Sequence, residues 1–405
     1  MTEFRAETVE KCLVRLSFPT AAKLQEQDYQ ASGLYPVVDQ GQTLIAGWTD
    51  DKSGLISTDL PVVVFGDHTR ALKYIDFPFV RGADGTQILK PKAGIEPLYF
   101  YYACRAIDLP SRGYNRHFKE LKQKEIQIPS VEQQRDIAMA LKLVDDARSF
   151  QDEQLIATET AKRAATQALF TRGLRNEAEK DTEIGPLPQT WGVSECEEVA
   201  HTITVGVVVK PASHYVEKGV PAFRSLNVKE DRIDASSLVY FSTSDNDEVL
   251  SKSKLKAGDV LVVRTGYPGT SCVVPEQFDG ANCIDLVIVK PRQDVMTSDF
   301  LSRFLNSESG KRQALSNSHG LAQQHLNVGA VRRLKLPVPP TLEEQRSIVA
   351  ILATIDRKID LHRQKRAVLD ELFNGLLHNL MTGEIRVGDL DLSALEPGEV
   401  RAGVA

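Results

Sequence analysis

Residues 128–137 read IPSVEQQRDI, and residues 338–348 read VPPTLEEQRSI. The two stretches align at an offset of 211 positions, and the same offset places Asp145 on Asp356. One register relates more than forty residues, which indicates an internal repeat. Chance similarity between two amphipathic helices is the alternative, but the shared Pro-x-x-Glu-x-Gln-Arg pattern is more specific than helical periodicity.

Each copy of the repeat carries the signals of a helix start. Pro129 and Pro340 disfavour helix immediately upstream, and Ser130 and Thr341 are N-cap residue types. Acidic side chains follow in the first turn, where they face the positive end of the helix dipole. We therefore predict that a helix begins at each copy.

The residues that follow have coiled-coil spacing. Apolar residues recur every four and three positions over residues 348–380, interrupted by His362 and Arg366, and the weaker first seam is interrupted by Arg148 and Gln151. Each helix of about 38 residues would span about 57 Å. We expect the two helices to pack against each other and to hold what they connect at a fixed separation.

Two globular segments flank the first helix. Glycine and proline in residues 172–191 (RGLRNEAEKDTEIGPLPQTW) indicate a helix end, a linker and the start of a new domain. Short β-branched runs punctuated by glycine, aspartate and proline predict strands, without a βαβ rhythm, so the fold class is α+β. The predicted segments are a first domain at 1–128, a helix and linker at 129–180, a second domain at 181–338, and a second helix with a tail at 339–405.

Composition limits the class of protein. The 405 residues suffice for two or three domains, and 42% hydrophobic with 26% charged residues is typical of a folded globular chain. The five cysteines are scattered and form no CxxC pair, which argues against disulfides and structural zinc. No signal peptide or membrane span is evident, so we expect a cytoplasmic protein. The net charge of −6 argues against coating of nucleic acid by bulk electrostatics.

Catalytic motifs are not evident. The chain has no P-loop, no Gly-x-Gly-x-x-Gly and no Asn-Pro-Pro-Tyr type motif. If the chain is an enzyme with an unrecognised active site, that site is expected around His68 or His214. We therefore predict a non-catalytic protein, with an enzyme as an alternative.

Several loops have residues suited to DNA. They combine arginine or lysine, amides, aromatic rings and glycines that allow close approach to a phosphate or a base edge. Each loop alone could be an ordinary polar turn, but the set favours DNA contact. The candidate DNA-binding residues are Arg264, Thr265, Gly266, Tyr267, Gly269, Arg224, Asn227, Gln40, Gln42, Arg112, Tyr114, Arg116 and Lys119.

These features together resemble the specificity (S) subunit of a type I restriction-modification enzyme. The resemblance rests on the duplicated helix start, on LPQTW at residues 187–191, on GDVLVVRTG at 258–266 and on YPVVDQGQ at 35–42. The first half departs from the pattern, because it lacks the Leu-Pro-x-x-Trp opening and a clear match to residues 258–266. This leaves the contact residues of the first domain less well defined.

The resemblance implies two target recognition domains that each read one half of a bipartite, asymmetric site in double-stranded DNA. It implies a pseudo-two-fold arrangement, in which the long helices form an antiparallel coiled coil that sets the gap between half-sites and binds two methyltransferase (M) subunits. The family's M subunits bind S-adenosylmethionine, and restriction (R) subunits use ATP and magnesium, so no cofactor, metal or membrane is expected for this chain. The helix residues expected to contact partners are Glu132, Gln134, Arg135, Ile137, Glu343, Gln345, Arg346, Ile348, Leu352 and Ile355.

Two further interpretations remain open at this point. One is a coiled-coil interaction protein without DNA specificity, and the other is an orphan DNA-binding subunit without an active methylase. Neighbouring genes for a methyltransferase and a helicase-nuclease would favour the type I complex over the interaction protein and over the enzyme, and their absence would leave an orphan DNA-binding subunit.

Overall fold

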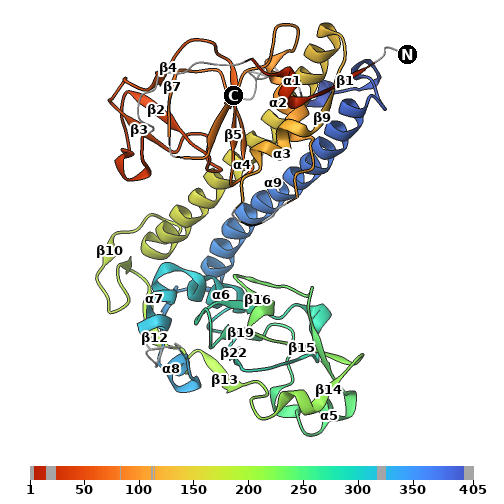
Figure 1. Cartoon of the computed structure of the whole chain (residues 1–405). Helices are drawn as coiled ribbons and strands as arrows, with labels where there is room; N and C mark the ends of the chain where they lie inside the picture. The colour runs from red at the N-terminus through yellow and green to blue at the C-terminus, as the bar shows by residue number, and fades with distance from the viewer. Residues whose placement is uncertain are drawn as a thin grey trace. The chain divides into compact units, whose positions relative to one another are not determined.

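The computed structural model of the chain describes residues 4–14, 24–82, 84–110, 113, 115–316 and 325–395 (Figure 1). It divides into two compact units. Unit 1 contains Met1–Glu153 and His362–Ala405, and unit 2 contains Gln154–Leu361. Because each unit includes residues from both long helices, each has its own helix pair.

The two predicted long helices are confirmed as α4 (Val131–Arg172) and α9 (Leu342–Thr382). Both predicted N-caps form, since the Ser130 hydroxyl accepts from the Gln133 N–H at 3.3 Å and the Thr341 hydroxyl from the Glu344 N–H at 3.2 Å. Glycines with positive φ follow each helix, Gly173 at +64° and Gly383 at +76°. These left-handed residues end the helices, as glycine commonly does.

Side chains join α4 to α9 in an antiparallel arrangement. In unit 1 the Arg148 Nε donates to Asp370 at 2.8 Å, and the Gln151 Oε1 lies 2.8 Å from the His362 Nδ1. In unit 2 the Lys162 Nζ lies 2.7 Å from Asp356. Partner numbers on α9 fall as those on α4 rise, so the predicted antiparallel pair is confirmed, and its polar seam residues bond across the seam.

The globular part of unit 1 contains two small sheets. Strand β5 lies between β6 and β8 in one antiparallel sheet, and the other has the order β3-β2-β7-β4 with β2 and β7 parallel. β1 pairs with β9 immediately before α4. The elements are β1 (Arg5–Thr8), α1 (Val9–Cys12), β2 (Tyr35–Val38), β3 (Gly47–Thr49), β4 (Leu55–Ile56), β5 (Val62–Gly66), β6 (Leu72–Ile75), β7 (Phe79–Arg81), β8 (Thr86–Leu89), α2 (Pro97–Arg105), α3 (Phe118–Gln123) and β9 (Glu125–Ile128).

Unit 2 has two four-stranded sheets, β13-β22-β19-β20 and β14-β18-β15-β21, and its β12 pairs with β23 immediately before α9. The elements are β10 (Glu179–Lys180), β11 (Leu187–Pro188), β12 (Gly192–Glu195), β13 (Ala200–Val205), β14 (Tyr215–Val216), β15 (Val220–Phe223), β16 (Val228–Lys229), β17 (Arg232–Ile233), β18 (Val239–Phe241), α5 (Thr243–Asp247), β19 (Val260–Val263), β20 (Ser271–Val273), β21 (Asn282–Cys283), β22 (Leu286–Pro291), α6 (Ser298–Asn306), α7 (Glu308–Ser316), α8 (Val328–Arg332) and β23 (Lys335–Val338).

The topology of unit 1 recurs in unit 2, although the globular sequences share little. β5 between β6 and β8 corresponds to β19 between β20 and β22, and the parallel pair β2 and β7 corresponds to β15 and β21. The nine-residue helices α2 and α6 occupy equivalent places. The predicted α+β fold is confirmed, and the repeat extends beyond the long helices to the domains before them.

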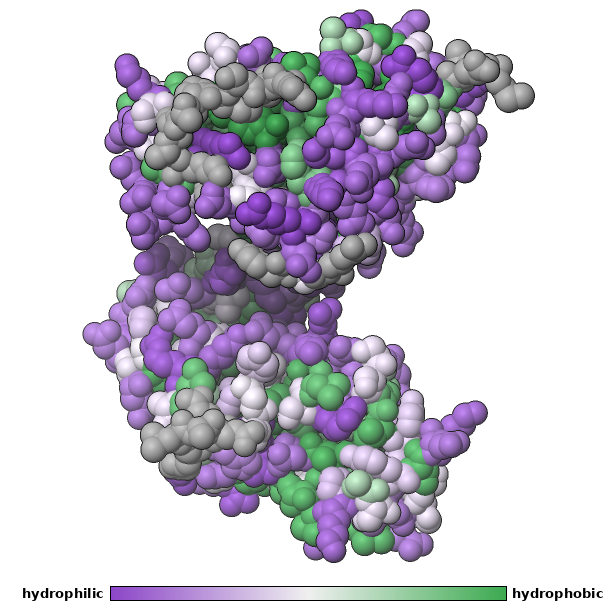
Figure 2. Space-filling view, in the orientation of Figure 1, coloured by the Kyte–Doolittle hydropathy of each residue, from purple (hydrophilic) through white to green (hydrophobic). Residues whose placement is uncertain are grey.

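Each unit is built around its own hydrophobic core, while the face seen in Figure 2 is mostly hydrophilic with smaller hydrophobic patches.

The Leu-Pro-x-x-Trp motif has a packing role in unit 2. Trp191 is fully buried, its ring lies 5.9 Å from that of Phe300, and its indole N–H donates to Glu344 at 3.3 Å. The motif thus fastens the start of the second domain to α6 and α9.

Candidate nucleic-acid interface

The loop between β19 and β20, residues 264–270, presents an aromatic side chain to solvent. Tyr267 is 83% exposed, more than any other large hydrophobic side chain among the described residues. Gly266 and Gly269 flank it with φ values of +94° and +89°, which favour glycine. A Cβ on Gly269 would lie 2.5 Å from the Ala314 Cβ, so this close approach also requires glycine. We call residues 264–270 the β19–β20 loop.

Arg264 forms the base of this loop. Its side chain is only 12% exposed, and its guanidinium lies 2.6 Å from the Asp285 carboxylate. The same group donates to the Leu326 carbonyl at 3.3 Å and contacts the His325 ring. Thr265 lies 3.0 Å from the other ring nitrogen of His325. Arg264 and Thr265 therefore fix the loop to residues 325 and 326, and His325 is a component of the site that sequence reasoning missed.

An equivalent connection exists in unit 1. The β5–β6 loop, residues 67–71, begins at Asp67, whose carbonyl accepts from the His117 N–H at 2.9 Å. The Asp67 carboxylate accepts from the Phe118 N–H at 2.8 Å. His117 and Phe118 align with His325 and Leu326 at an offset of 208. The β5–β6 loop is thus the counterpart of the β19–β20 loop. The amino-acid sequence of the β5–β6 loop alone does not reveal this correspondence.

The other predicted residues of unit 1 have different environments. Gln40 faces inward and its side-chain oxygen accepts from the His68 N–H at 3.3 Å. Gln42 is exposed and lines a hollow of about 670 Å³ together with Arg70. Arg116 and Lys119 are exposed, with the Arg116 side chain 80% accessible. The predictions for Arg112 and Tyr114 lie outside the described residues.

The prediction that Asn227 contacts a DNA base is corrected, because its side chain is buried. Asn227 is fully buried, and its amide donates to the Asp234 and Ser237 carbonyls, each at 2.9 Å. Its side-chain oxygen accepts from the Arg224 N–H at 2.9 Å. All of its hydrogen-bonding groups are therefore used inside the loop, so Asn227 shapes the loop instead of reaching a base edge. Arg224 is half-buried and donates to the Ser237 carbonyl at 3.1 Å.

Comparison with known proteins relates the second half of the chain, which contains the β19–β20 loop, to one family. The family described as type I restriction modification DNA specificity domain matches residues 188–371, which include the β19–β20 loop. Residues 188–371 thus match a DNA specificity domain of type I restriction-modification systems, and the chain is similar to specificity subunits of that type.

Individual relatives agree with this assignment. The putative type I restriction enzyme MjaX specificity subunit of Methanocaldococcus jannaschii is 25% identical over 74% of this chain and 71% of its own. The MjaVIII specificity subunit of the same organism is 27% identical, and the match covers 66% of this chain and less than two thirds, 63%, of that relative. The crystal structure of the type I S subunit from M. genitalium has the same fold, with a TM-score of 0.61 at 14% identity over 94% of this chain and 96% of that one.

The structure revises which residues of the long helices can face a partner. Gln134 is fully buried, and its side-chain oxygen accepts from the Glu96 N–H at 2.8 Å. Gln345 is equally buried and accepts from the Thr297 N–H at 2.8 Å. Glu96 and Thr297 are the N-caps of α2 and α6, so the repeated glutamine fastens each short helix to a long one. The prediction that these two glutamines contact a partner is corrected for this reason.

The apolar residues predicted to contact a partner are also used within the chain. Ile137, Ile348 and Leu352 lie in the cores of their own units, which corrects that part of the prediction. Ile355 is partly buried. The predicted charged residues are exposed and remain candidates for partner contact, namely Glu132, Arg135, Glu343 and Arg346.

Exposed apolar side chains on the two long helices were not predicted. In unit 1, Met139 and Phe150 of α4 are 66% and 54% exposed, and Val368 and Leu372 of α9 are 63% and 37% exposed. They lie outside the a/d seam that sequence periodicity singles out. Such side chains can supply apolar contact to another subunit.

The histidines of the enzyme alternative have local partners. The His214 Nδ1 lies 2.9 Å from the Asp245 carboxylate, and this hydrogen bond lowers the pKa of Asp245. His68 lies in the β5–β6 loop, and its N–H donates to the Gln40 side-chain oxygen at 3.3 Å. Over the described ranges, no group of three or more metal-ligating side chains occurs, and no helix is both long and apolar enough to cross a membrane.

Proposed function

We propose that this chain is the DNA-reading scaffold of a type I restriction-modification complex, acting in the cytoplasm. The proposal rests on one observation: both units contain a strand-loop-strand element whose loop is hydrogen-bonded to residues at or just before the start of a short helix. These residues are His117 and Phe118 in unit 1 and His325 and Leu326 in unit 2. The loops differ in sequence between the units, which suits two different half-sites of an asymmetric target. The family match over the second half supports the same function.

The remaining parts of the proposal concern partners. Two M subunits would bind the helix pairs through the exposed charged and apolar side chains described above, and R subunits would complete the complex. S-adenosylmethionine, ATP and magnesium would be bound by those subunits, and this chain would perform no catalysis. The net charge of −6 fits a complex in which partner subunits supply part of the phosphate contact that dominates DNA affinity.

Deletion of the gene tests the proposal directly. We expect the chain to co-purify with its M subunit, and N6-methyladenine at one bipartite motif to disappear from host DNA in the deletion strain. Single-molecule sequencing of host DNA with and without the gene measures this. A stable complex without any change in methylation would contradict DNA reading, and the absence of a complex would favour an interaction protein of another kind.

Arg264→Ala is expected to weaken recognition through unit 2. Removing the guanidinium releases Asp285, His325 and the Leu326 carbonyl from the base of the β19–β20 loop, so the Kd for target DNA should rise about tenfold or more. Titration of the purified complex with target duplex measures the Kd. The variant should still assemble with M subunits, and unchanged target methylation would refute the assignment.

Asp285→Asn is the matched variant for this experiment. It leaves Arg264 in place but removes the carboxylate that holds it at 2.6 Å. Part of the loss seen with Arg264→Ala should appear, because Arg264 acts through the loop. A normal Kd for Asp285→Asn together with a raised Kd for Arg264→Ala would instead indicate that Arg264 touches DNA directly.

A further inference from the structure

The repeat places an aspartate on each long helix opposite an arginine of the adjoining short helix. In unit 1 the Arg105 Nη1 of α2 lies 2.7 Å from the Asp145 carboxylate of α4. In unit 2 the Arg303 Nη1 of α6 contacts the Asp356 carboxylate of α9. Asp145 and Asp356 align at the offset of 211, so the same type of ion pair joins helix to helix in both units.

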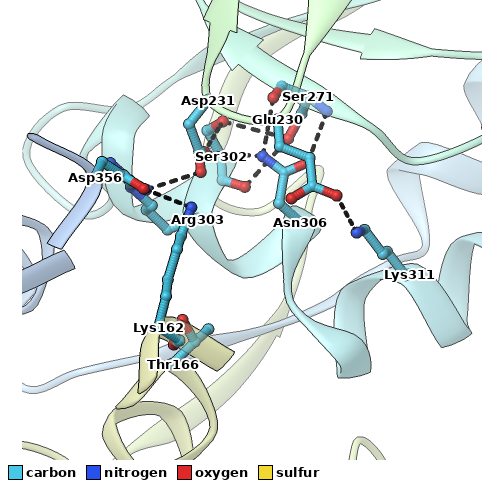
Figure 3. A network of polar contacts seen from close by, with 10 residues as sticks. All are labelled: Lys162, Thr166, Glu230, Asp231, Ser271, Ser302, Arg303, Asn306, Lys311 and Asp356. Atoms are coloured by element: carbon cyan, nitrogen blue, oxygen red, sulfur yellow. Dashed lines mark hydrogen bonds and ion pairs between the residues drawn. The ribbon is translucent and has the colours of Figure 1, made fainter. Parts of the chain in front are cut away.

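The pair in unit 2 is part of a larger network, shown in Figure 3. Arg303 also lies 3.0 Å from the Asp231 carboxylate, and Asp356 also accepts from Lys162 of α4 at 2.7 Å. The Arg303 and Asp231 side chains are 11% and 13% exposed. Both long helices therefore meet α6 through one set of largely buried charges.

The network continues to the β19–β20 loop. Asp231 is in the turn between β16 and β17, and its N–H donates to the Ser271 carbonyl at 2.9 Å. Asn306 donates to the Asp231 carboxylate at 2.8 Å, accepts from the Ser271 N–H at 3.0 Å and donates to the Ser271 carbonyl at 2.9 Å. Ser271 is the residue that immediately follows the loop. A continuous series of contacts thus links the loop to α4 and α9.

Charge and burial make this linkage stiff. Burial raises the pKa of Asp231, and the nearby Arg303 together with hydrogen bonds from Ser302 and Asn306 opposes that rise. Burial also acts to raise the pKa of Asp356, but the contacts with Lys162 and Arg303 have the larger effect, so the pKa of Asp356 is lowered. Buried polar networks whose members are paired hold one arrangement, because each alternative leaves a charge without a partner.

We propose that Arg303 and Asp356 are positioning residues for DNA recognition, which hold the β19–β20 loop at one height and angle on the helix pair. The inference rests on the proposed function, since it concerns how the second half-site is read. A loop held in this way accepts one gap between half-sites and rejects others. Loss of the network lets the loop move on the helices, so discrimination between gap lengths falls.

The test is Asp356→Asn in the assembled complex with M subunits. Methylation rates are measured on three duplexes that carry the native gap, one extra base pair or one base pair fewer. We expect the ratio of the native rate to the altered-gap rates to fall about tenfold, while co-purification with M subunits is unchanged. A general loss of stability would lower all three rates together and leave the ratio constant, so the ratio reports positioning.

Lys311→Ala is the matched control. Lys311 of α7 pairs with Glu230, the neighbour of Asp231, but both side chains are substantially exposed, at 40% and 50%. An exposed pair of this kind contributes little, so the ratio should stay at the wild-type value. If Asp356→Asn does not fold, Arg303→Lys replaces it, because a lysine keeps the charge but lacks the rigid, planar fork of N–H donors that a guanidinium holds in one orientation.

The outcomes separate the inference from the proposed function. A wild-type ratio in folded Asp356→Asn, or in folded Arg303→Lys, overturns the positioning role. A wild-type complex that methylates no bipartite site overturns the proposed function, and the inference with it. A reduced ratio in Asp356→Asn but not in Lys311→Ala supports both.

Discussion

Four residues inserted into α4 after Glu153, together with four into α9 after Leu361, should shift the preferred gap between half-sites by about two base pairs. The insertion lengthens each helix by about 6 Å, and four residues are close to one turn, so the helix faces stay aligned. Since each base pair of B-DNA rises about 3.4 Å, methylation of the native target should fall more than about a hundredfold.

Both insertions fall at the boundary between units 1 and 2, so they preserve the pairs within each unit. These include Arg148 with Asp370 in unit 1 and Lys162 with Asp356 in unit 2. Methylation of a set of duplexes with gaps from the native value to four base pairs longer measures the shift. The control inserts the same residues after Asn176, in a linker that starts and ends in unit 2. An unchanged gap preference in the double insertion would disprove the idea that the helices set the gap.

The long helices could be predicted well because their signals are local. Proline and a capping hydroxyl define each start, and the structure begins the helices at Val131 and Leu342, one residue after the predicted caps. The lengths of 42 and 41 residues exceed the predicted 38. The helices continue past the last regular seam positions, until a glycine with positive φ ends each of them.

The recognition residues were harder to predict, because residue type does not reveal burial. Arg264 and Asn227 have side chains that can pair with base edges, but tertiary contacts use both to shape loops. The equivalent loop of unit 1 begins at Asp67 and shares no distinctive side chain with its counterpart. Only backbone topology and the aligned His117 and His325 relate them, and topology is not evident from one sequence. Tyr267 was predicted as a candidate, and its exposure keeps it one.

The repeated motif was recognised correctly, but the role of its glutamine was not. The repeated Pro-x-x-Glu-x-Gln-Arg pattern led to the prediction that its glutamine contacts a partner subunit. In the structure Gln134 and Gln345 are buried and form hydrogen bonds that connect the long helices to α2 and α6. Glutamine suits this place because one side chain supplies both a donor and an acceptor. Gln345, for example, also donates to the Val295 carbonyl at 2.8 Å. The specificity of the motif thus reflects the joint between a recognition domain and a long helix.

Gln345→Leu is therefore expected to destabilise unit 2. Leucine has a similar volume but leaves the Thr297 N–H and the Val295 carbonyl buried without partners. Each such group costs about 1–3 kcal/mol, so we expect a loss of about 3 kcal/mol and a fall of roughly 5–10 °C in the Tm of unit 2. Calorimetry of the full chain measures this, with the two units analysed as separate transitions because each unit has its own main hydrophobic core.

Arg346→Ala tests the neighbouring position, whose side chain is exposed. Its Tm should stay close to the wild-type value, since surface substitutions usually change stability by less than about 0.5 kcal/mol. Assembly with M subunits separates the two roles of the motif. If Gln345 held a partner directly, Gln345→Leu would lose assembly at an unchanged Tm. The buried bridge requires the opposite: a lowered Tm, with assembly retained at temperatures where unit 2 is still folded.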